Sequence, residues 1–128
     1  MEADISGSQR KVVVSSVRPA KSRREDSGIW LKGGQTLPFV VRRAWSAPAG
    51  VYNEQWFLVD VGTREVIYEG PVRGTSIWGL QSLTELSDEV RAPLELAPGR
   101  YLVVFSLGRV MGGQIEVEAS EASEEEAA

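Results

Sequence analysis

Short runs of β-forming residues, separated by glycine and proline signals, recur along this chain at intervals of about 8–12 residues. The runs are rich in Val, Ile, Leu and aromatic residues, and they are too short for helices. The expected strands are 11–17, 29–31, 36–45, 55–61, 65–69, 75–80, 91–96, 101–107 and 114–119. Such spacing is typical of an antiparallel sandwich and not of alternating β and α units. The sequence therefore predicts an all-β fold, an antiparallel β-sandwich of about eight strands.

One stretch departs from this strand pattern. Residues 81–90 place Leu83, Leu86 and Val90 at spacings of three and four, which gives one apolar side at helical spacing. We expect either a helical turn or two here, or a long connection between strands.

The two ends of the chain differ in composition from its middle. Residues 1–10 are polar and predict a flexible arm, and residues 120–128 hold four glutamates and no apolar residue larger than alanine. Residues 11–119 are then the sandwich domain, and the acidic tail is expected to be disordered. Charge follows the same division: residues 1–43 carry nine basic and four acidic groups, whereas residues 44–128 carry five and fourteen.

The chain contains no cysteine and no histidine. Thiolate metal sites, disulfides and cysteine nucleophiles are therefore excluded. Histidine is the commonest acid–base group near neutral pH and the commonest metal ligand, so serine–histidine triads and most zinc, copper and haem sites are excluded as well. We expect no enzyme activity, no cofactor and no metal.

A tyrosine follows the turn that precedes the most hydrophobic stretch. In "LAPGRYLVVFSL" (96–107), Pro98 and Gly99 reverse the chain and Tyr101 begins the next strand. A buried tyrosine at such a corner fills core volume while its hydroxyl bonds the backbone a few residues upstream. Together with "GGQIEVEA" (112–119), this stretch resembles immunoglobulin-like and fibronectin-type sandwiches. The resemblance implies an immunoglobulin-like or jelly-roll-like architecture, without the cysteine pair of antibody domains, and it implies no particular function.

Four tryptophans are candidates for either core or surface. Trp56 and Trp78 lie inside short apolar runs, so we expect both in the core. Trp30 and Trp45 lie at strand ends beside loops, and Trp45 has Tyr52 close by in sequence. Exposed, these three rings would form a platform on which a sugar could stack.

Basic residues cluster in the first third of the chain, and Arg23, Arg24, Arg42 and Arg43 are the candidates for partner contacts. A nucleic acid partner is not expected, because no aromatic residue interleaves the cluster and the net charge is −4. A solvated loop that meets acidic groups of a neighbouring subunit explains the cluster as well.

The sequence holds no apolar segment of the ~18 residues needed to span a membrane and no apolar signal-peptide core. We therefore expect a cytoplasmic location, with a virion-associated location as the alternative.

Without catalytic residues, the leading hypothesis is a structural or assembly subunit of an appendage, complex or virion that acts through protein contacts or self-association. The open edges of its sheets would serve as docking sites. The alternative is a carbohydrate-binding module that uses Trp30, Trp45 and Tyr52.

Overall fold

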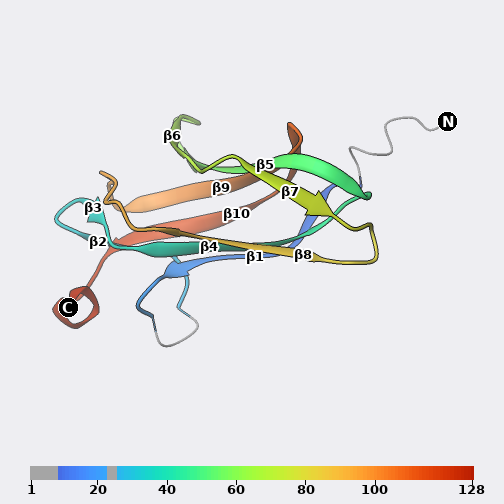
Figure 1. The fold of residues 1–128 in the computed structure, drawn as a ribbon. Coiled ribbons are helices and arrows are strands. Elements are labelled where there is room, and N and C mark those ends of the chain that lie inside the picture. The colour runs from blue at the N-terminus through green and yellow to red at the C-terminus, as the bar shows by residue number, and fades with distance from the viewer. Residues whose placement is uncertain (1–8, 23–25) are drawn as a thin grey trace.

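The computed structural model describes residues 9–22 and 26–128, which form two β-sheets around one core (Figure 1). The smaller sheet has three antiparallel strands in the order β1-β4-β8. These are β1 (Lys11–Pro19), β4 (Phe39–Ser46) and β8 (Thr84–Val90). In Figure 1 this sheet lies beneath the larger one. The all-β class expected from the sequence is confirmed.

The larger sheet has seven strands in the order β3-β2-β10-β9-β5-β6, and β7 also pairs with β5. They are β2 (Ile29–Lys32), β3 (Gln35–Thr36), β5 (Gly50–Asp60), β6 (Val66–Glu69), β7 (Arg73–Ile77), β9 (Gly99–Leu107) and β10 (Val110–Glu121). All neighbours in it are antiparallel except β10 and β2, which run parallel. The sheet curls into a half-barrel, so its outer surface is not flat.

Residue alternation explains which side of each strand faces the core. In β4, every second residue from Phe39 to Trp45 is buried, whereas Arg42 between them is exposed. In β5, Trp56 and Leu58 are fully buried and Phe57 between them is partly exposed. This period of two is the pattern of a strand with one face against a core.

Two segments of the fold differ from the sequence prediction. Residues 84–90 form strand β8, and not a helical turn or a connection, because they pair with β4 along their whole length. Asp88 and Val90 are buried, Thr84 and Leu86 are partly buried, and the residues between these positions are exposed. Residues 91–96 do not form a strand, and their one β-type contact is an isolated bridge between Glu95 and Gln35.

The acidic tail is ordered beyond the expected boundary. Strand β10 continues to Glu121, which pairs with Leu31, and helix α2 (Glu124–Ala127) follows. Ser123 caps this helix: its hydroxyl accepts from the Glu126 N–H at 3.1 Å, and the Glu126 carboxylate accepts from the Ser123 N–H at 2.9 Å. The S-x-x-E sequence is a capping box, which explains why a helix begins here. Most of the expected N-terminal arm, residues 1–8, lies outside the described residues.

Tyr101 occupies the corner expected for it. Its ring is buried, with 4% of its surface exposed, and its hydroxyl donates to the carbonyl oxygen of Ala97 at 2.6 Å. The bond spans four residues and satisfies a backbone group at the bend before β9. Among the described residues, no helix is long and apolar enough to cross a membrane.

Candidate functional site

A hollow of about 690 Å³ lies on the outer face of the larger sheet, on the side of β5 that faces away from the core. We call it the outer hollow. It is lined by Arg10, Val51, Tyr52, Asn53, Gln55, Phe57, Val72, Ser106, Gly108, Arg109 and Met111. Strand alternation places every second residue of β5 here, because Glu54, Trp56 and Leu58 take the inward positions. The outward residues are Val51, Asn53, Gln55 and Phe57.

The turn between β9 and β10 closes one end of the outer hollow. Gly108 and Arg109 both have positive φ, 59° and 70°, as a two-residue hairpin turn of type I′ requires. The Gly108 N–H donates to the carbonyl oxygen of Asn53 at 2.8 Å, which ties the turn to β5. Arg109 is thereby held exposed at the rim.

Arg10 closes the same end from the N-terminal side. Its Nη1 donates to the carbonyl oxygen of Leu107 at 3.0 Å. Its guanidinium also lies over the ring of Tyr52, 4.7 Å from the ring centre, which is a cation–π contact. Tyr52 is fixed in turn, because its hydroxyl donates to the carbonyl oxygen of Pro48 at 2.8 Å.

The lining of the outer hollow suits an anionic, hydrogen-bonding ligand. It combines two guanidinium groups, the amides of Asn53 and Gln55 and the hydroxyl of Ser106, with no carboxylate among its lining residues. The chain as a whole has 18 acidic residues and a net charge of −4. The positive charge of the outer hollow is therefore a local property and does not reflect the net charge of the chain.

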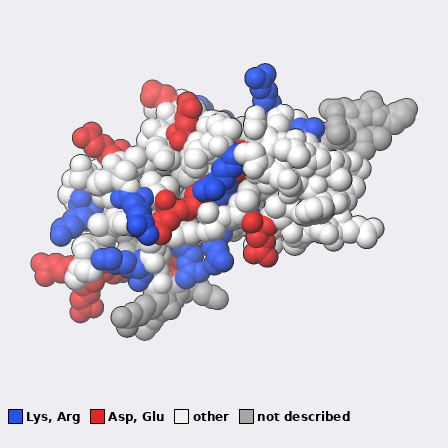
Figure 2. Space-filling view, viewed as in Figure 1, with Lys and Arg blue, Asp and Glu red and all other residues white. Residues whose placement is uncertain are grey.

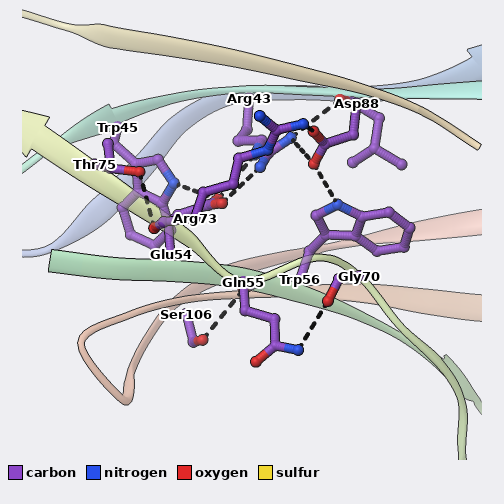
Figure 3. A network of polar contacts seen from close by, with 11 residues as sticks. Arg43, Trp45, Glu54, Gln55, Trp56, Gly70, Arg73, Thr75, Asp88 and Ser106 are labelled. Atoms are coloured by element: carbon purple, nitrogen blue, oxygen red, sulfur yellow. Dashed lines mark hydrogen bonds and ion pairs between the residues drawn. The ribbon is translucent and has the colours of Figure 1, made fainter.

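Behind β5, on the core side, lies a network of buried charged and polar side chains (Figure 3). Arg43 makes two bonds to Glu54, Nε–Oε2 at 2.8 Å and Nη2–Oε1 at 2.6 Å, and its Nη1 lies 3.0 Å from Oδ2 of Asp88. The indole N–H groups of Trp45 and Trp56 donate to Glu54 at 2.9 Å and to Asp88 at 2.8 Å. Figure 3 shows Gln55 and Ser106 on the opposite side of β5, away from this network.

The network is electrically balanced. Arg73 forms an ion pair with Asp88 from the partly exposed edge, so two guanidinium groups meet two carboxylates. Burial alone would lower the pKa of Arg43, but its hydrogen bond and charge interaction with Glu54, with a further contribution from Asp88, raise that pKa above its usual value. Arg43 is therefore a permanent cation that holds the two sheets together. No cluster of acidic residues suited to a metal occurs in the part of the chain that the structure describes.

The structure separates the residues that the sequence singled out. Trp45, expected at an exposed rim, is fully buried and bonded to Glu54, and Arg43, expected at a partner surface, is also buried. Both point inward because they share the parity of Phe39 along β4. The sugar-stacking platform of Trp30, Trp45 and Tyr52 is therefore wrong.

The remaining candidates lie in different places. Tyr52 lines the outer hollow, Trp30 is half-buried beside Pro19 and Leu37, and Arg42 is exposed on the outer face of the smaller sheet. Arg23 and Arg24 lie outside the described residues.

Trp56 is in the core as expected, whereas Trp78 is not: 82% of its surface is exposed. Trp78 follows the last residue of β7, so neither sheet covers it.

Sequence reasoning missed Arg10, Asn53, Gln55 and Arg109. For three of them the signal was present. The run 51–57 alternates, so its outward row could be read, and "LGRV" between two strands marks a tight turn with an arginine at its tip. Arg10 gave no such signal, because its place depends on contacts with Leu107 and Tyr52, far along the chain.

Comparison with known proteins gives a fold likeness only. No protein-family model matches the chain, and no curated protein matches it in sequence. Among solved structures, it is similar to the Pseudomonas fluorescens alkylpurine DNA glycosylase AlkC bound to DNA containing an abasic site analog, with a TM-score of 0.61 and 16% sequence identity. The match covers 88% of this chain and 30% of that chain, so this chain corresponds to less than a third of the glycosylase.

This likeness corrects two expectations. The chain was expected to be a structural or assembly subunit that acts through protein contacts or self-association, with carbohydrate binding as the alternative and no nucleic acid partner. A fold shared with part of a DNA-bound glycosylase contradicts both the assembly role and the exclusion of nucleic acid. Net charge was a poor guide here, because two basic and two amide side chains gather locally on one face.

Proposed function

We propose that this chain is a DNA-binding module and that the outer hollow is its contact surface. The observation that carries the proposal is the lining of the hollow, which combines Arg10 and Arg109 at one end with the amides of Asn53 and Gln55 and contains no carboxylate. The likeness in fold to a glycosylase solved bound to DNA supports the same reading.

Each kind of lining side chain has a role that DNA chemistry explains. Guanidinium groups bind phosphate oxygens and position the protein on the backbone. Side-chain amides offer both donors and acceptors, which suits the edges of bases. Tyr52 and Phe57 add aromatic surface to the same hollow, and such rings stack on sugars and bases.

The electrostatics predict modest and strongly salt-dependent binding. The two guanidinium groups of the hollow would displace about two counterions, so the logarithm of the affinity should fall with the logarithm of salt with a slope of roughly −2. Because the net charge is −4, the remainder of the surface repels the DNA backbone and confines contact to the hollow.

We also propose that the module binds without catalysing a reaction, and that its two sheets are an immunoglobulin-like variant. The absence of histidine and cysteine from the sequence supports the first proposal. The bond from Tyr101 to Ala97 before β9 supports the second.

Fluorescence anisotropy with labelled single-stranded and double-stranded DNA tests the proposed function. Arg109→Gln should weaken binding several-fold and reduce the salt slope by about one. Arg100→Gln is the matched control, since Arg100 is an exposed arginine near the opposite end of β9 and lies 3.9 Å from Glu116. The proposal fails if neither form of DNA is bound at low salt, or if the two variants weaken binding equally.

A further inference from the structure

One end of the molecule brings together two long segments without charged residues. Residues 44–53 and 74–84 contain no Asp, Glu, Lys or Arg. The fold places them side by side: Gly50 pairs with Ile77, Trp45 pairs with Thr84, and the Ser46 hydroxyl donates to the carbonyl oxygen of Leu80 at 3.2 Å. In Figure 2 the right-hand part of the molecule, over the ends of β5, β7 and β8, is largely white, whereas charges of both signs cover the left.

Trp78 is the most exposed large apolar side chain at this end. Its exposed fraction is 82%, compared with 77% for Val51 and 45% for Leu80. Two other tryptophans, Trp45 of β4 and Trp56 of β5, are fully buried, and their N–H groups are bonded to carboxylates. A fold that encloses these two indoles leaves this one in water, where its large apolar area is available to a ligand.

Strand register places Trp78 beside the outer hollow. Gly74 and Ser76 are exposed residues of β7, and they pair with Asn53 and Val51 of the hollow. Trp78 is the next position in this alternation, one residue beyond the end of the strand. An occupant of the hollow that extends past Val51 would therefore reach the indole.

Cations border the same end. Lys11 pairs with Ser46, which belongs to the uncharged segment 44–53, and Arg10 and Arg109 lie at the β9–β10 turn. Of the nearest acidic residues, Glu54 is buried against Arg43. Glu85 is exposed on the smaller sheet, which also contains Lys11, and it pairs across from Ala44. An indole surrounded by uncharged surface and bordered by cations suits a ligand with a flat apolar face and an anionic backbone.

We propose that Trp78 stacks on an unpaired base of the DNA held at the outer hollow, so that the module prefers single-stranded or gapped DNA to intact duplex. This inference rests on the proposed DNA binding. Every base has a π-face that an indole can cover, but in an intact duplex neighbouring bases already occupy it. The cations of the hollow would hold the phosphates on either side of the stacked base.

The test compares three labelled DNAs of the same sequence: a single strand of about 16 nucleotides, the intact duplex, and the duplex with a one-base gap. The wild-type protein should bind the single strand and the gapped duplex more tightly than the intact duplex. Trp78→Ala should weaken binding to the single strand and to the gapped duplex by roughly tenfold and leave binding to the intact duplex unchanged, since stacking contributes about 1–3 kcal/mol per base and 1.4 kcal/mol is tenfold. Trp78→Phe should retain part of the preference, and single-stranded DNA should quench the tryptophan emission of wild-type protein but much less that of Trp78→Phe.

Val66→Ala is the control, because Val66 is an exposed apolar residue on β6 away from this end. The Trp78 variants should unfold at the wild-type temperature, since the indole is exposed, so a binding change is not a folding change. The inference is overturned if Trp78→Ala binds all three DNAs as wild type does, or loses affinity for all three equally. If Arg109→Gln still weakens binding in that case, the proposed function survives without the stacking role. If wild-type protein binds no DNA, both fail.

Discussion

Arg43 of β4 and Glu54 of β5 form a two-bond ion pair that joins the two sheets through the core, with neither side chain exposed. Burying two opposite charges is costly, and the cost is offset only where each remaining donor and acceptor has a partner. Trp45 and Asp88 supply those partners. The pair therefore fixes β4 opposite β5, which in turn decides that Gln55 and its neighbours point outward into the hollow.

Removing the charge of Glu54 should strongly destabilise the protein. In Glu54→Gln, Arg43 stays charged and buried with only Asp88 nearby, so we expect the free energy of unfolding to fall by about 3–5 kcal/mol. Urea denaturation measures this. Glu89→Gln is the control, since Glu89 pairs with Arg91 at the surface and such pairs contribute about 0–1 kcal/mol. Equal and small effects of the two substitutions would show that the buried pair does not stabilise the fold.

Gly112 allows β10 to pass close to the core tryptophan of β4. It sits at the register shift between Met111 and Gly113, and a Cβ at this position would lie 2.6 Å from Cη2 of Trp45 and 2.9 Å from the carbonyl oxygen of Arg10. Gly112→Ala should therefore destabilise the protein by about 1–3 kcal/mol, as overpacking does. Gly74→Ala is the matched control, because a Cβ there meets nothing within 4 Å. Thermal unfolding of both variants checks this, and an unchanged midpoint for Gly112→Ala would contradict it.

Tyr101 should make stability fall at alkaline pH. Burial raises its pKa above the ordinary value of 10.0, and the charge of Asp60 raises it further. The folded state therefore favours the neutral phenol, and its contribution is complete below pH 10.0 and is lost as pH rises from there through the raised pKa. Tyr101→Phe should lose this contribution to the alkaline slope and, with the bond to Ala97 gone, about 1 kcal/mol at neutral pH. Urea denaturation from pH 8 to 11 measures both. If Tyr101→Phe keeps the wild-type alkaline slope, the assignment is wrong.

The sequence predicted most strands because their periodicity is local, but it could not assign every face. Trp45 and Trp78 both lie near strand ends. Trp45 follows the inward parity of Phe39 and Val41, a signal that was readable, whereas Trp78 is exposed because β7 ends before it, which only the packing determines. Residues 84–90 fit a helical spacing of leucine and valine, yet pairing with β4 makes them a strand. Tertiary context overrides weak local preference in such cases.

The same limit applies to the outer hollow. Asn53 and Gln55 look like ordinary solvent-facing residues of a strand, and Arg10 and Arg109 are separated by nearly the whole domain. Only the bonds from Arg10 to Leu107 and from Gly108 to Asn53 bring them to one place. Net charge and local clusters of basic residues therefore pointed elsewhere.

The positive φ of Arg109 lowers the stability of the fold, and a substitution can separate this cost from the proposed role of Arg109 in DNA binding. Arg109 and Arg64 both have positive φ, 70° and 65°, a conformation that disfavours most side chains by about 1–2 kcal/mol but that asparagine tolerates. Arg109→Asn and Arg64→Asn should each raise the free energy of unfolding by about 0.5–1 kcal/mol. Arg64 lies in the β5–β6 turn, where its N–H donates to Asp60, a bond that asparagine keeps. Only Arg109→Asn should weaken DNA binding, because only Arg109 lines the outer hollow. Paired urea denaturation and anisotropy measurements on the two variants would reject this if Arg109→Asn gained stability and bound DNA as tightly as wild type, or if Arg64→Asn lost as much affinity as Arg109→Asn.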